Sequence, residues 1–177
     1  MGIAREPRAS DTLSLSLAGL QAGMAAVLFM LAWLGLSAEW RQSSFWTPEN
    51  LWASTFYGSA AIHRGFSTST LSGLALYLLV YSAFGCLFAA VVRGFVRPLR
   101  LALIGVIAAI GWYYLSFHLI WHAVSPLVWL LHAERPTLFG HILYGAAVAQ
   151  FPRYLPAAIP APVLEPASVS ISPTPSI

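Results

Sequence analysis

Charge is scarce in this chain of 177 residues. Asp, Glu, Lys and Arg together make up 8% of it, whereas hydrophobic residues make up 58%, and the mean hydropathy is +0.72. A water-soluble domain carries about 25% charged residues. The composition therefore excludes a soluble enzyme, a nucleic-acid-binding protein and a disordered regulator, even though the isoelectric point is 9.4. The sequence predicts an integral membrane protein.

Lysine is absent, so all nine basic residues are arginines, and six acidic residues leave a net charge of +3. Cysteine is nearly absent as well. The single Cys86 excludes an intramolecular disulfide, and its apolar surroundings indicate a packing residue rather than a reactive thiol. Nucleophile-elbow and phosphate-loop motifs are missing too. The chain offers little for catalysis.

Four apolar segments approach the roughly 20 residues that a helix needs to cross a bilayer. They cover residues 13–36, 71–92, 101–121 and 137–151. The expected fold is all-α, a polytopic membrane protein with four transmembrane helices. The last segment is short, so we expect it to tilt little or to thin the bilayer locally. None of the four contains an acid or an arginine, which argues against an ion-coupled transporter.

The arginines indicate the orientation, because basic residues in short loops stay in the cytoplasm. One side of the predicted membrane holds Arg5, Arg8, Arg93, Arg97, Arg100 and Arg153, and the other holds three arginines balanced by three glutamates. We therefore expect a bacterial inner-membrane protein with both termini in the cytoplasm. Arg93, Arg97 and Arg100 are expected to contact anionic lipid headgroups. A signal peptide cleaved before Ala38 is the alternative for the first segment, although its apolar run is long for one.

The segments outside the membrane differ in character. Residues 1–12 form a cytoplasmic N-terminus, and residues 48–62 predict an amphipathic helix at the outer interface, begun by Thr47 as a capping residue. A shorter helix is expected at residues 127–131. Residues 152–177 hold seven of the twelve prolines, which predicts a flexible cytoplasmic tail.

Small residues occur at spacings that allow close helix contact. Gly19 and Gly23 form one such pair, and Gly105 with Ala109 another. We expect them to pack the bundle internally rather than to join two copies of the chain. Residues 70–77 and 137–144 also share Thr, Leu, Gly and Tyr at matching positions. This match suggests a duplicated helical hairpin, and convergence between leucine-rich spans explains it equally well.

The five histidines all fall at or beyond the predicted outer face. His118 and His122 are four residues apart on one helix, and His141 enters at a comparable depth. Because imidazole binds zinc, copper and haem iron, these three residues form a hypothetical metal or haem site. The alternative is that they are ordinary interfacial histidines, since their spacing is not a specific metal-binding motif.

Four tyrosines are expected near the middle of their spans: Tyr81, Tyr113, Tyr114 and Tyr144. Buried tyrosine hydroxyls need partners in lipid, so these residues are expected to bond between helices. An aromatic pocket for a lipid or a quinone-like molecule is the alternative.

Residues 141–145, with the sequence His-Ile-Leu-Tyr-Gly, are followed by Phe-Pro-Arg-Tyr at residues 151–154. Together with residues 50–58 they resemble parts of small uncharacterised bacterial inner-membrane families with four spans. The resemblance implies the architecture and no site. We expect a non-catalytic accessory, scaffold or assembly component that contacts membrane lipids, other membrane subunits and no nucleic acid. The alternatives are a metal or haem protein and a lipid or quinone binder.

Overall fold

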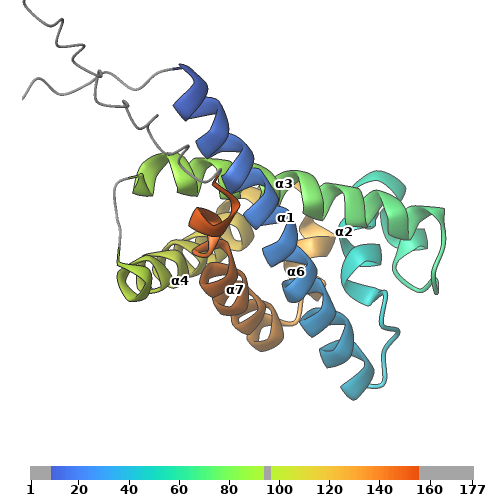
Figure 1. The fold of residues 1–177 in the computed structure, drawn as a ribbon. Coiled ribbons are helices and arrows are strands. Elements are labelled where there is room, and N and C mark those ends of the chain that lie inside the picture. Colours follow the sequence, from blue (N-terminus) through green and yellow to red (C-terminus); the bar gives the residue numbers. More distant parts are fainter. Residues whose placement is uncertain (1–8, 94–96, 156–177) are drawn as a thin grey trace, which may run out of the picture.

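The computed structural model describes residues 9–93 and 97–155, and these ranges fold into helices (Figure 1). The four longest are α1 (Ala9–Trp40), α3 (Thr68–Val92), α4 (Pro98–Leu115) and α7 (Glu134–Val148). The shorter elements are α2 (Thr47–Tyr57), the 3-10 helix η1 (Gly58–Ala61), the π-helix η2 (Ser116–Trp121), α5 (His122–Val124), α6 (Pro126–Leu131) and the 3-10 helix η3 (Phe151–Tyr154).

Three helical stretches are long and apolar enough to cross a membrane, as in a multi-pass membrane protein. They are Thr12–Trp40, Thr68–Val92 and Pro98–Val124, and the last of these runs through η2 into α5. The fourth predicted segment falls on α7, which has 15 residues and is therefore about 22 Å long. That α7 is a fourth crossing stays a prediction.

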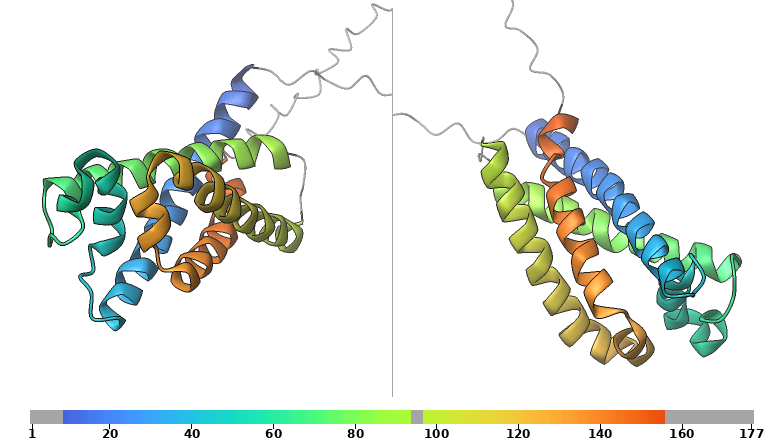
Figure 2. Two further views of the ribbon diagram at one scale, coloured as in Figure 1. Left: turned by 180° about the vertical axis from the view of Figure 1, so that it is seen from behind. Right: turned by 90° about the horizontal axis from the view of Figure 1, so that it is seen from below.

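The long helices lie in the order α3, α1, α7, α4 (Figure 2). α1 packs against both α3 and α7, and α4 packs mainly against α7. The last described element, η3, packs against α1, and its Phe151 ring lies 6.2 Å from that of Phe88 near the end of α3. At the other end α2 packs against α6.

Glycines bring helix backbones into direct contact in two helical hairpins, which we define as α1 with α3 and α4 with α7. A Cβ on Gly19 of α1 would lie 2.6 Å from the carbonyl oxygen of Gly85 in α3. A Cβ on Gly145 of α7 would lie 2.5 Å from the carbonyl oxygen of Gly105 in α4. The expected internal use of Gly19 and Gly105 is thus confirmed. Duplication stays a prediction.

Helix α2 forms where it was expected, but the side that it buries carries polar as well as apolar residues. That it lies at the outer membrane interface stays a prediction. Glu49 and Asn50 are only 2% and 0% exposed, whereas Phe56 is 61% exposed. Asn50 is buried because its amide donates to carbonyl groups in the loop before α3 and its oxygen accepts from the Thr70 hydroxyl at 2.7 Å. The expected cap was also wrong, since Thr47 is already helical and no side chain caps α2.

The predicted terminal segments are described only in part. Most of residues 1–12 and, within the tail of residues 152–177, residues 156–177 lie outside the described residues. The first tail residues, Pro152 to Tyr154, belong to η3 rather than to an irregular chain. The short helix expected at residues 127–131 is confirmed as α6.

The glycine contact between α4 and α7 predicts a difference between two glycines of one helix. Gly105→Ala should lower the thermal unfolding midpoint in detergent, because the added methyl group overlaps the Gly145 carbonyl oxygen and overpacking costs about 1–3 kcal/mol. Gly111 has no atom near its Cβ position. Gly111→Ala should leave the midpoint unchanged or raise it, as alanine favours the helix by about 0.5–1 kcal/mol. Equal midpoints for the two variants would contradict this contact.

Candidate functional site

The centre of the bundle is a bond between a histidine and a tyrosine on different helices. His141 of α7 is 1% exposed, and its Nε2 lies 2.7 Å from the hydroxyl of Tyr81 in α3. Its Nδ1 lies 2.7 Å from the carbonyl oxygen of Thr137. A carbonyl only accepts, so Nδ1 carries the proton, and in the neutral ring Nε2 accepts from the tyrosine. Both ring nitrogens are therefore occupied.

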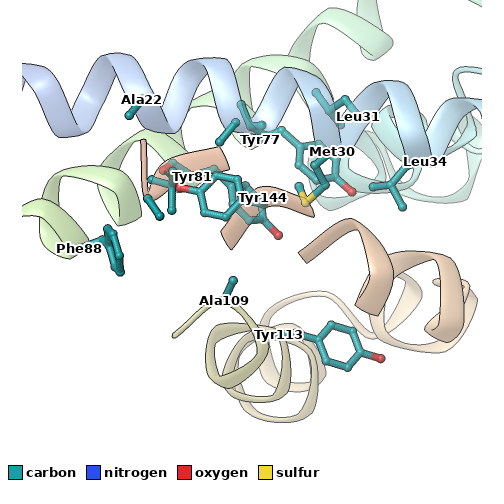
Figure 3. Packing of buried hydrophobic residues seen from close by; sticks show 14 of the residues in the cluster. Ala22, Met30, Leu31, Leu34, Tyr77, Tyr81, Phe88, Ala109, Tyr113 and Tyr144 are labelled. Carbon is teal, nitrogen blue, oxygen red and sulfur yellow. Dashed lines mark hydrogen bonds between the residues drawn. The ribbon is translucent and has the colours of Figure 1, made fainter. Parts of the chain in front are cut away.

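A second bond joins the same two helices. Tyr144 of α7 is fully buried, and its hydroxyl donates to the backbone carbonyl oxygen of Tyr81 at 2.7 Å. The two tyrosine rings lie edge to face with their centroids 4.9 Å apart (Figure 3). α3 and α7 otherwise pack mainly against α1 rather than against each other. These polar contacts therefore link α3 to α7 in the interior, in addition to the packing of α1 on α7.

A similar pair lies beside the first. The hydroxyl of Tyr113 in α4 is 3.4 Å from Nε2 of His132, whose Nδ1 donates to the Trp129 carbonyl oxygen at 2.6 Å. Burial lowers the pKa of His132, so this half-buried ring is neutral at pH 7. The Tyr113 ring also meets the His141 ring, with centroids 5.2 Å apart.

We call this set of five residues the tyrosine–histidine cluster. It consists of Tyr81, Tyr113, Tyr144, His132 and His141. Its hydrogen bonds link α3 to α7, and α4 to the residue that follows α6.

An aromatic stack extends from the cluster to α2. Trp52 lies flat on Tyr77, with ring centroids 3.7 Å apart, and also contacts Trp121 of η2 at 4.6 Å. A cavity of about 50 Å³ lies beside the stack, between Trp52, Tyr77, Phe117 and His132. This volume has room for a few water molecules. Ligand pockets usually measure about 300–1,000 Å³, so the cavity does not accommodate a quinone.

The three histidines of the predicted metal or haem site have separate surroundings. His118 is exposed and stacks on Tyr114, and His122 is exposed and meets Trp129 edge-on, while His141 is buried. His118 and His122 are separated by the end of the π-helix η2, whose turns are wider than α-helical ones. Across the described ranges no group of three or more His, Cys, Asp or Glu side chains could hold a metal ion. The structure thus does not assemble His118, His122 and His141.

The predicted tyrosines divide into two groups. Tyr81, Tyr113 and Tyr144 are buried and bonded between elements, as expected, whereas Tyr114 is 52% exposed and lies outside the cluster. The basic residues Arg93, Arg97 and Arg100 are all exposed around the end of α3 and the start of α4. Their exposure suits contact with lipid headgroups, which stays a prediction.

Glu49 was not recognised from the sequence as a buried acid. Its side chain lies inside the protein with Oε2 unpaired among the described residues, and burial raises its pKa from 4.5 to about 7. Its position in the first turn of α2 is typical of an exposed acid near a helix start. No sequence signal sets it apart from such an acid. His132 was missed because its partner is a residue of another helix.

The central bond predicts the effect of removing one hydroxyl. Tyr81→Phe leaves Nε2 of His141 without a donor in the interior, and such a loss costs about 1–3 kcal/mol. The unfolding midpoint in detergent should fall by several degrees. Tyr114→Phe, at an exposed position, should leave the midpoint unchanged. If both variants have the unfolding midpoint of the parent chain, the bond does not contribute to stability.

The buried acid predicts a pH dependence of stability. Between pH 4.5 and about 7 the folded state keeps the proton on Glu49 while the unfolded state releases it. Stability should therefore decrease as the pH rises through this window, by about 3 kcal/mol in total. Glu49→Gln should remove this decrease, whereas Glu39→Gln, at an exposed position, should retain it. Unfolding midpoints measured from pH 4 to 8 test the prediction, and an unaltered slope in Glu49→Gln would refute it.

Comparison with protein-family models, with curated proteins and with solved structures finds no match for this chain. The resemblance to small four-span inner-membrane families, centred on residues 141–145, therefore stays a prediction.

Proposed function

We propose that the chain is a multi-pass protein of the bacterial inner membrane that acts as a non-catalytic accessory, scaffold or assembly component of a membrane complex. The observation that carries this proposal is the internal bonding of the tyrosine–histidine cluster. Both ring nitrogens of His141 are occupied, and the neighbouring cavity measures about 50 Å³. The polar side chains of the interior thus hold the helices together, and contacts with partner proteins are made by the outer surface.

The path of the chain supports four crossings with both termini in the cytoplasm. α1 begins, and α7 leads into η3, at the same end of the bundle, which requires an even number of passes if each long helix crosses. The exposed Arg93, Arg97 and Arg100 lie around the connection from α3 to α4. Basic residues in a short connection favour the cytoplasmic side.

The outer faces of two helices are rich in large apolar side chains. On α3 these are Leu79, Leu87 and Val91, and on α4 they are Leu99, Leu103 and Ile107, each at least 56% exposed. Such faces are covered by lipid chains or by the helices of another membrane protein. α3 and α4 touch at Phe84 and Trp112, whose ring centroids are 5.3 Å apart, and each helix presents its own exposed apolar side chains to partners.

Site-specific crosslinking tests this role. A photoreactive residue is placed at Leu79, at Ile107 or at Leu28 of α1, all of them exposed positions on different helices. We expect at least one position to crosslink in cells to a single membrane protein that also co-purifies in a fixed ratio in mild detergent. If every position crosslinks only to lipid and the chain purifies alone, the accessory role is wrong. Metal and haem analysis of the same preparation tests the alternative based on His118, His122 and His141.

Fusing reporter enzymes to the two termini tests the topology independently. A reporter enzyme that works only in the cytoplasm should be active at both termini, and one that works only outside the cytoplasm should be inactive at both. Reporters in opposite compartments would show an odd number of crossings.

A further inference from the structure

Two adjoining hollows lie on the outside of α2 and α3. The first is an open apolar groove of about 490 Å³, lined by Phe56, Tyr57, Ser72, Ala75, Leu76 and Leu79. The second measures about 250 Å³ and is lined by Tyr57, Ala60, Ala61, Arg64, Thr68 and Ser69. Tyr57 lines both, so the two hollows are neighbours on one surface. Neither belongs to the tyrosine–histidine cluster.

Both hollows are lined mainly by apolar surface, and the one charged residue among the described residues that line them, Arg64, marks what we call the polar end. The second hollow lies at the first residues of the helix, Thr68 and Ser69, where the candidate membrane span begins. The apolar groove continues from Ser72 to Leu79. Leu79 is 11 residues beyond Thr68, which corresponds to about 16 Å along an α-helix. The polar end thus lies where a span meets water, and the apolar end reaches toward the hydrocarbon core.

The side chains at the polar end suit a phosphate group. Arg64 is exposed and carries a planar guanidinium that forms paired hydrogen bonds with phosphate oxygens. The exposed Thr68 adds a hydroxyl group on the same hollow. Between the two hollows the hydroxyls of Tyr57 and Ser72 are 3.1 Å apart. A tyrosine at this boundary is typical of the headgroup level of a membrane.

The walls of the groove suit an acyl chain. Phe56 is 61% exposed and Leu79 is 69% exposed, and both line the groove. The groove is open on its outer side, where the hydrocarbon of the bilayer surrounds a membrane span. A phospholipid has both of the parts that these hollows suit, a phosphate group and an acyl chain.

We propose that these two hollows form a binding site for one phospholipid, with an acyl chain in the groove and the headgroup phosphate at Arg64 and Thr68. The proposal rests on the membrane placement in the proposed function, but it does not depend on the accessory role. It concerns a different place from Arg93, Arg97 and Arg100.

Native mass spectrometry of the full chain in mild detergent tests the site, with 1-palmitoyl-2-oleoyl-phosphatidylglycerol as the probe. We expect one retained lipid per chain. Ala75→Trp, which fills the groove, and Arg64→Gln, which removes the charge, should each lower retention by roughly tenfold. Leu103→Trp places the same indole ring at an exposed position of α4, away from both hollows, and should leave retention unchanged. Unfolding midpoints of all three variants verify that they fold.

The possible outcomes separate the two halves of the site. If Ala75→Trp retains as much lipid as the parent protein, no acyl chain occupies the groove. If Arg64→Gln does so, no phosphate group lies at the arginine. Either result overturns the proposal. Displacement of the lipid by excess inorganic phosphate would show a free-phosphate site and would also overturn it. A failure of the membrane placement looks different, because the parent chain would then stay monodisperse in buffer without detergent.

Discussion

Polar groups inside a bundle that faces lipid must bond to one another, because no water is available to them. The bond between Tyr81 and His141 meets this requirement and joins the α1–α3 hairpin to the α4–α7 hairpin. The Thr137 carbonyl fixes the imidazole tautomer, so the ring has one acceptor and it faces the tyrosine. The orientation of α7 relative to α3 follows from this geometry, and so does the placement of Tyr144.

Close backbone packing and side-chain hydrogen bonds both join the helices. Within each hairpin, glycines let the backbones touch, as Gly19 and Gly85 do in the first and Gly105 and Gly145 in the second. Between the hairpins, α1 packs on α7 through side chains such as Met30 and Leu34, and the aromatic rings and hydroxyls of the cluster link α3 to α7. Close backbone contact gains dispersion energy in lipid, where burial of apolar surface gives little advantage. The cluster adds directionality, which apolar contacts lack.

The sequence predicted the helices well because each long apolar run is itself a helix, and it predicted the internal use of Gly19 and Gly105. It did not show which side chains meet. Tyr113 and Tyr114 look alike in sequence, but successive residues of a helix point about 100° apart, so only Tyr113 can face the cluster. Tyr81 and His141 are separated by 60 residues, and no local pattern reports that pairing. Glu49 is buried because α2 packs against α3, and this tertiary contact leaves no local pattern in the sequence.

The central position of α1 has a consequence for biogenesis. Among the described helices α1 is translated first, and α7, one of its two main neighbours, follows about a hundred residues later. The indole of Trp33 donates to the carbonyl oxygen of Pro136 at 2.9 Å, so this donor lacks its partner until the start of α7 has been made. Insertion machinery or lipid must shield that flank of α1 in the interval, and the bundle closes only after α7 has followed.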